Sequence, residues 1–345
     1  MNLKIDENRR NQLLRWTKMR TSEFTAAKVR LIRFLHQEMG FGVLAFESSL
    51  FECHRANQGS DHLTAEELMR SCISPVWYSN EILPLFQYIL ETRNTARPLR
   101  LAGFDTQTST KTAEHRPAFW RALLEPLDDR YAQQVATMDS SLLDIQYQRE
   151  ALAEEAENLI AGYRRLEEYL EDRGQELINS GADEDTVGLA QRMADSIVRQ
   201  IQQLTSPTGA ERTRVRDEGM SANLNWLMNY LYSDEKIVTW GHNFHLRHAN
   251  QEVKPNPVKT MGAWMAEGYR DEMYTIGLYM RSGRAALNNR QVYNVAAPSS
   301  GSLESILGHV GEPYFFVDLR RTGTESAGEW VRKPIVTKTW GRADA

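Results

Sequence analysis

Polar side chains that can carry protons follow three short apolar segments, each at the point where the segment ends. They are Glu47, Asp105 and His242, which follow residues 42–46, 98–104 and 236–240. A second histidine, His245, comes three residues after His242. Because ligands bind at the carboxyl ends of parallel strands, we expect these groups to meet at one edge of a sheet. Carboxylates and imidazoles gathered there could exchange protons with water.

Each of these residues also has a purely structural interpretation. A carboxylate after a strand is frequently the N-cap of the next helix, and Asp105 alone is equally compatible with that role. Ser48 or Ser49 could cap the helix after Glu47 and leave its carboxylate available. The remaining histidines are expected on the surface, in helix packing or in polar loops, and they are His36, His54, His62, His115, His248 and His309.

Other common chemistries lack their sequence signals. The two histidines of a zinc protease helix lie four residues apart with a glutamate between them, and the spacing of His242 and His245 does not match. No GxSxG nucleophile motif, phosphate-binding glycine loop or dinucleotide fingerprint occurs in the sequence. We therefore expect acid–base chemistry on water, with no metal, no cofactor and no covalent intermediate.

Apolar periodicity predicts alternating helices and strands before and after a long helical region. Residues 24–39 have apolar side chains at helical spacing and end at Gly40, a common residue at helix C-termini. Further helices are expected at 82–90, 261–269 and 302–309, and strands at 42–46, 98–104, 236–240, 273–280 and 314–318. Strands separated by helices indicate βαβ units, and so an α/β fold with a mostly parallel sheet.

The helical region between these two parts has a sustained heptad seam. From residue 135 to 170, apolar residues alternate at spacings of three and four with one interruption at Arg149, and Gly174 and Gly181 are expected to end the seam. The seam could form a coiled-coil dimer. We favour an intramolecular helical hairpin, and hence a monomer, because the predicted helices at 183–204 and 211–231 can cover the seam. The predicted organisation is a discontinuous α/β core of residues 1–115 and 234–345, with a helical insertion at 116–233.

Composition narrows the class of protein. Hydrophobic residues make up 41% of the chain and charged residues 25%, as in globular proteins. The net charge is −5 and the charges are evenly spread, which argues against nucleic acid or an anionic membrane as a partner. Only two cysteines occur, Cys53 and Cys72, so a disulfide framework is excluded. No stretch of 18 apolar residues and no leader-like apolar start is found, and we expect a cytoplasmic protein that binds a small molecule.

A series of short blocks resembles the erythromycin esterase family. In chain order they are Ser22-Glu23-Phe24 through Lys28, the run 30–35, GFGVLAFESS at 40–49, Trp77, Arg93-Asn94, PLRLAGFDTQ at 98–107, RDEGMSANLNWL at 216–227, IVTWGHNFHL at 237–246, Met261-Gly262 and FFVDLR at 315–320. The resemblance implies a three-layer α/β/α core with a helical insertion. It also implies metal-independent hydrolysis of a carboxylic ester, which in the family's resistance enzymes is a macrolide lactone. Some relatives are labelled as polysaccharide-biosynthesis proteins, so the substrate does not transfer.

The resemblance also suggests roles for individual residues. Glu47, Asp105, His242 and His245 fall on family motif positions that line the cleft, and we expect Glu47 and the two histidines to be catalytic. Asp105 is expected to bind substrate. Three further residues are expected to do the same: Glu23 and Lys28, which match the helix after the family's first motif, and Arg247, which follows the histidine pair.

The family's first motif is where this chain departs from the pattern. The family has a strand leading into a Gly-Glu-x-x-His-Gly turn, whose histidine is thought to activate water. Aligned back from Glu23, the glutamate and histidine positions hold Trp16 and Met19, neither of which can accept a proton from water. The sequence of residues 13–24 favours a helix or loop over a strand.

Three functional hypotheses follow. The first is an esterase-type hydrolase with weak or absent activity, since losing a general base costs on the order of 10²–10⁴ in rate. The second is a non-catalytic relative that binds a small molecule at the same site, and the third is a helical interaction protein that uses the seam. The presence of Trp16 and Met19 at the motif positions has two explanations: the chain is a shortened version of a full enzyme, or it is a diverged relative. We favour the shortened chain, because both ends look short beside the family pattern.

Overall fold

The computed structural model describes residues 13–15, 21–59, 62–248, 257–287, 289–319 and 335–337. The chain divides into two compact units, one of residues 1–16 and 26–276 and the other of residues 17–25 and 277–345. The predicted site positions Trp16 and Met19 lie outside the described residues.

The first unit is built on a five-stranded, fully parallel sheet with the strand order β3-β2-β4-β1-β5. The strands are β1 (Leu13–Arg15), β2 (Phe41–Ser49), β3 (Arg100–Asp105), β4 (Lys236–Trp240) and β5 (Met273–Thr275). Leu44 of β2 pairs with Leu101 of β3 on one side and with Val238 of β4 on the other. The predicted parallel α/β sheet is therefore confirmed.

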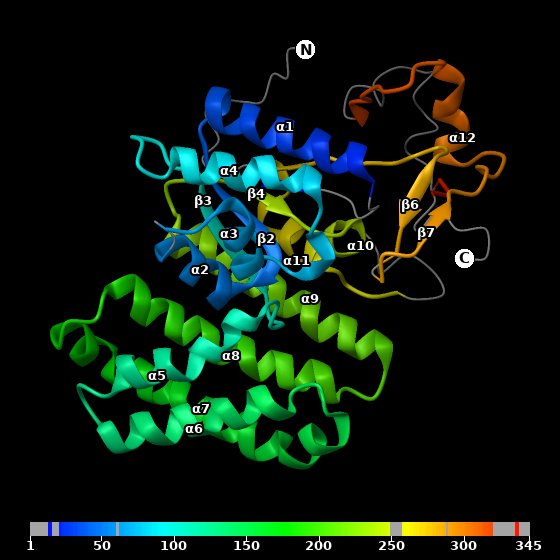
Figure 1. Cartoon of the computed structure of the whole chain (residues 1–345). Helices are drawn as coiled ribbons and strands as arrows, with labels where there is room; N and C mark the ends of the chain where they lie inside the picture. The colour runs from blue at the N-terminus through cyan, green and yellow to red at the C-terminus, as the bar shows by residue number, and fades with distance from the viewer. Residues whose placement is uncertain are drawn as a thin grey trace. The chain divides into compact units, whose positions relative to one another are not determined.

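Helices cover both faces of this sheet (Figure 1). Alternate residues of a strand point to opposite faces. Accordingly, Leu44 and Phe46 pack with α1 (Ser22–Met39) and α4 (Leu83–Thr92), together with α2 (Leu50–Gln58) and α3 (Ala65–Cys72). Val43 and Ala45 instead belong to a core shared with the long helices and with α11 (Met261–Tyr269). The three-layer arrangement expected from the family resemblance is confirmed.

The helical region consists of α5 (Arg116–Leu124), α6 (Asp129–Ile145), α7 (Arg149–Asn179), α8 (Glu184–Thr205) and α9 (Gly209–Trp226). The seam crosses two helices, because the chain leaves the helix at residues 146–148. The prediction that Gly174 ends the seam is wrong: α7 continues to Asn179, and Gly181 follows with a φ of +108°. The seam residues Leu159 and Leu166 are buried in the same core as Ile197 of α8.

Three other expectations about strands are corrected. Residues 13–15, expected in a helix or loop, form β1, because β4 and β5 supply parallel partners on its two sides. The strand expected at 273–280 ends at Thr275. The apolar run 314–318 is not a strand in the described chain; Tyr314 is 77% exposed and Phe316 44%, so the run lacks the burial that a core strand requires.

The second unit contains a two-stranded antiparallel sheet that sequence periodicity did not predict. Its strands are β6 (Arg284–Ala286) and β7 (Val292–Asn294), followed by α12 (Leu303–Leu307). In the part of the chain that the structure covers, no helix is both long and apolar enough to cross a bilayer. Cys53 and Cys72 are buried free thiols, as expected.

Candidate active site

The carboxyl ends of three adjacent strands bring the predicted residues together. Glu47 lies at the end of β2, Asp105 ends β3, and His242 follows β4, with β2 in the middle. His245 lies on the short helix α10 (Asn243–Leu246), which His242 caps. Each of these four residues is less than 10% exposed.

A bulge at the end of β2 orients Glu47. Phe46 pairs with Gly103 and Ser49 with Asp105, so Glu47 and Ser48 stand opposite the single residue Phe104. A bulge of this kind inserts one extra residue and turns a side chain out of the normal alternation. Ser48 is fixed there, because its hydroxyl accepts the backbone N–H of Ser74 at 2.9 Å.

Ser49 caps the helix that follows. Its hydroxyl accepts the backbone N–H of Glu52 at 3.4 Å, so the predicted serine cap is present and the Glu47 carboxylate is directed elsewhere. Asp105 does not act as a helix cap. Its carboxylate accepts the N–H of Gln107 at 3.3 Å and otherwise faces an arginine.

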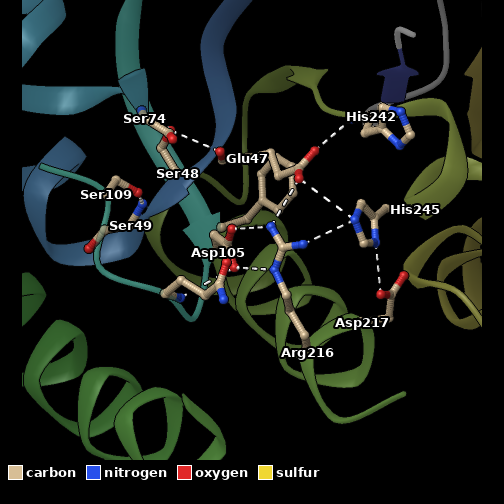
Figure 2. Close-up of polar contacts among 12 residues, drawn as sticks. Glu47, Ser48, Ser49, Ser74, Asp105, Ser109, Arg216, Asp217, His242 and His245 are labelled. Atoms are coloured by element: carbon tan, nitrogen blue, oxygen red, sulfur yellow. Dashed lines mark hydrogen bonds and ion pairs between the residues drawn. The ribbon is translucent and has the colours of Figure 1, made fainter. Parts of the chain in front are cut away.

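That arginine, Arg216 of α9, is the centre of the site (Figure 2). Its Nε lies 3.1 Å from Asp105 Oδ1, and one terminal nitrogen lies 2.5 Å from Asp105 Oδ2 and 2.9 Å from Glu47 Oε1. Burial opposes the charged form, but the carboxylates of Asp105 and Glu47 outweigh it and raise the pKa of Arg216. Arg216 is therefore a fixed cation that holds two carboxylates from neighbouring strands.

His245 lies between Arg216 and a third buried acid, Asp217. Its Nε2 is 3.1 Å from the other terminal nitrogen of Arg216 and 3.7 Å from Glu47 Oε1, while its Nδ1 is 2.8 Å from Asp217 Oδ2. Burial lowers the pKa of His245, but the charges of Asp217 and Glu47 raise it by more, so the net shift is upward from 6.5. Since an arginine N–H can only donate, the contact with Nε2 corresponds to the neutral ring with its proton on Nδ1.

His242 is held by different contacts. Its backbone N–H donates to Glu47 Oε2 at 2.6 Å, and its Nδ1 accepts the backbone N–H of Phe244 at 3.2 Å. The centroids of the His242 and His245 rings are 6.1 Å apart. Glu47 therefore joins both histidines and Arg216 in one network.

Lys28 lies in an aromatic environment, and its charge interacts with that of Glu47. Its Nζ is 4.3 Å from the ring centroid of Trp240 and 5.7 Å from that of Trp77, and the residue is 3% exposed. Burial lowers the pKa of Lys28 to about 7, although the charge of Glu47 acts in the opposite direction. Lys28 thus acts on Glu47 through its charge, and its role in binding substrate stays a prediction.

The other two predicted binding residues are placed differently. Glu23 is exposed in the first turn of α1, where it accepts a hydrogen bond from Ser22 at 3.0 Å. Arg247 follows α10, and its guanidinium carbon lies 5.9 Å from the ring centroid of Phe244. The substrate-binding roles of Glu23, Arg247 and Asp105 stay predictions, as do the catalytic roles of Glu47, His242 and His245.

Sequence reasoning did not single out Arg216 and Asp217, although both lie in the block RDEGMSANLNWL. Three adjacent charged residues, Arg216, Asp217 and Glu218, lie in the long helical region, but the sequence does not indicate which of them turn inward. Among the residues that the structure describes, no group of three or more His, Cys, Asp or Glu could hold a metal ion.

Comparison with known proteins identifies the family of this chain. The family model described as erythromycin esterase matches residues 36–345 of the chain. The chain belongs to the erythromycin esterase family. The match includes the site residues at 47, 105, 216, 217, 242 and 245.

Individual proteins are also similar to this chain. The chain is 28% identical over 339 residues to a protein of Bacillus subtilis (strain 168) named "Putative hydrolase YbfO", with 92% of this chain and 76% of that protein covered. A solved structure of a Bacillus cereus protein matches with a TM-score of 0.74 at 20% identity, covering 92% of this chain and 79% of that one. A mutant of erythromycin esterase EreC in its open conformation matches with a TM-score of 0.68 at 19% identity, covering 87% of this chain and 79% of that one. These two structures share the fold of this erythromycin esterase family member.

Proposed function

We propose that this protein hydrolyses a carboxylic ester or lactone by direct attack of water, with His245 as the general base. The observation that carries the proposal is the convergence of Glu47, Asp105 and His245 on the single cation Arg216. Membership of the erythromycin esterase family and the similarity to a protein named as a hydrolase support a hydrolase-like function.

The chemistry needs a proton acceptor and a group that stabilises negative charge. Water displaces the Arg216 N–H from Nε2 of His245 and gives one proton to that nitrogen as its oxygen bonds to the acyl carbon, and the carbonyl oxygen becomes an oxyanion. The guanidinium of Arg216, 3.1 Å from that nitrogen before water enters, can then donate the released N–H to the oxyanion. The bond to the alcohol oxygen then breaks, and that oxygen takes the proton back from His245, so the products are one acid and one alcohol.

In this proposal His245 takes over the base function that the family assigns to its first motif. The charges of Asp217 and Glu47 raise the pKa of His245 above 6.5, which makes it a stronger base than a free imidazole. Macrolides are the substrates to test first, because a named relative of this fold is an erythromycin esterase.

Hydrolysis of nitrophenyl esters and of erythromycin by the wild-type protein and the His245→Ala variant tests the proposal. We expect the variant to be slower by about 10²–10⁴-fold, the usual contribution of a general base. The control is His309→Ala, which removes an exposed histidine bonded only to nearby helix carbonyls among its described contacts. Equal rates for wild type and His245→Ala would exclude the proposed base. Calorimetric binding of erythromycin without product would instead favour the non-catalytic binding hypothesis.

A further inference from the structure

Asp217 contacts the ring nitrogen of His245 that Arg216 does not. Its Oδ2 lies 2.8 Å from His245 Nδ1, and its Oδ1 accepts the backbone N–H of Met261 at 2.7 Å. Asp217 is fully buried, and Figure 2 shows its carboxylate facing the lower side of the His245 ring. Both carboxylate oxygens are therefore committed, one to each of two chain segments.

The second of these segments is well suited to hold a carboxylate. Met261 is the first residue of α11, and the first N–H groups of a helix have no partner within the helix. The helix dipole also favours a negative charge at this end. The Met261 N–H consequently fixes Asp217 with one oxygen turned toward His245.

We propose that Asp217 is a positioning residue that keeps the ring proton of His245 on Nδ1, so that Nε2 remains the basic nitrogen. The inference rests on the proposed function only for its kinetic consequence. A carboxylate can only accept a hydrogen bond, and a neutral imidazole has one N–H. With Asp217 accepting at Nδ1, the lone pair is left on Nε2, the nitrogen that faces Arg216 and Glu47.

The neutral ring of His242 has the opposite tautomer to that of His245. Its Nδ1 accepts the Phe244 N–H, so the neutral ring of His242 carries its proton on Nε2. The two neutral rings therefore carry their protons on different nitrogens, His245 on Nδ1 and His242 on Nε2, and only His245 has a basic Nε2.

The Asp217→Asn variant should move the ring proton of His245 to the other nitrogen, with little change in the shape of the side chain at position 217. Its amide oxygen can still accept the Met261 N–H, but its NH₂ group then faces His245 Nδ1 and can only donate. We expect the ring to move its proton to Nε2, which breaks the hydrogen bond from Arg216 to that nitrogen and removes the basic lone pair there. In the Ser-His-Asp triad of serine proteases, the corresponding change lowers kcat about 10⁴-fold by the same route.

Nitrogen-15 NMR of the histidine rings tests the inference without any turnover. In the wild-type protein at a pH where the ring is neutral, we expect the His245 signals to show a protonated Nδ1 and an unprotonated Nε2. The Asp217→Asn variant should show the reverse, while the His242 signals should stay as in wild type. The two residues are assigned by the signals lost in His245→Asn and His242→Asn. A wild-type His245 protonated on Nε2, or a pattern that Asp217→Asn leaves unchanged, would overturn the inference.

Kinetics on a hydrolysed ester supply the second readout. Asp217→Asn should lower kcat by about 10²–10⁴-fold with KM changed less than about threefold, and the acidic limb of its rate profile should move to lower pH. The matched control is Asp172→Asn, an exposed position on α7, which should behave as wild type. A purely structural Asp217 would instead lower the melting temperature with no change in tautomer. If no ester is hydrolysed by the wild type, the proposed function fails, and the NMR result still decides the role of Asp217.

Discussion

Arg216 is the residue on which the charges of the site depend. Its guanidinium pairs with Asp105 and Glu47, which are 5% and 6% exposed. Removing one partner of a buried ion pair costs about 3–5 kcal/mol, because the remaining charge is left without compensation.

We therefore expect Arg216→Ala to lower the free energy of unfolding by about 3–5 kcal/mol at pH 7. Urea unfolding at pH 7 measures the loss. Arg216→Lys should restore only part of the stability, because an ammonium group cannot form the two-point contact with Asp105. An Arg216→Ala variant as stable as wild type would contradict this account.

The burial of Lys28 leads to a second electrostatic prediction, which concerns how the stability of the protein changes with pH. Its pKa is about 7 in the folded protein and about 10.5 in the unfolded chain, so the unfolded chain binds more protons between these values. Stability should therefore rise with pH from about 7 to about 10.5. In Lys28→Met this rise should be smaller, and the variant should be more stable than wild type at pH 7 by a few kcal/mol. Melting temperatures of both proteins from pH 6.5 to 9.5 measure the difference; parallel curves would refute it.

At this scale, the sequence indicated the residues at strand ends better than those on helices. Glu47, Asp105 and His242 could be found because a polar residue directly after a buried strand has a defined place in a parallel sheet. Asp217 could not, because α9 shows almost no separation of polar and apolar faces to indicate which of its charged residues turn inward. The placement of Lys28 between Trp77 and Trp240 likewise depends on three segments far apart in the chain.

Strands β2 and β3 must approach closely for their carboxylates to share Arg216. Gly103 makes this possible, since a Cβ atom at this position would lie 2.1 Å from the carbonyl oxygen of Ser49 and 2.6 Å from that of Ser48. Those atoms are backbone and belong to the bulged end of β2, so they cannot move aside as a flexible side chain would.

We expect Gly103→Ala to push the ends of β2 and β3 apart, to destabilise the protein by about 1–3 kcal/mol and to lower hydrolytic activity. Thermal unfolding and an ester assay measure the two effects. The control is Gly188→Ala in α8, where a Cβ atom would meet only Trp226 at 3.7 Å. That variant should be stabilised by up to about 1 kcal/mol, as expected for replacing glycine within a helix. Similar effects of both substitutions would contradict a special role for Gly103.

The elements that were predicted correctly are those with strong local signals. β4 and α11 were predicted with their exact bounds, and α1 to within two residues at its start, because each has a clear pattern of apolar residues. β1 was missed because three residues carry no usable periodicity, and only the partners β4 and β5 make them a strand. The run 314–318 was assigned wrongly because its apolar residues resemble a buried strand, although they are exposed.

At the scale of the whole molecule, the packing of the heptad seam leads to a prediction about the oligomeric state. Leu166 of the seam is fully buried within the chain, so no apolar surface is left at this position for a second copy. We expect light scattering to show a monomer, and Leu166→Ala to lower the free energy of unfolding by about 2–5 kcal/mol without changing the molar mass. A wild-type dimer that the substitution dissociates would refute the intramolecular packing.

The pairing of β2 with both β3 and β4 has a consequence for biosynthesis. β3 leaves the ribosome soon after β2, but Val238, the β4 partner of Leu44, is made almost two hundred residues later. Until then, one long edge of β2 has no neighbour, and contacts of such sequence separation form slowly. During translation, this unpaired apolar edge can aggregate with other chains. We therefore expect the yield of folded protein in cells to depend on chaperones more strongly than the stability of the finished protein would suggest.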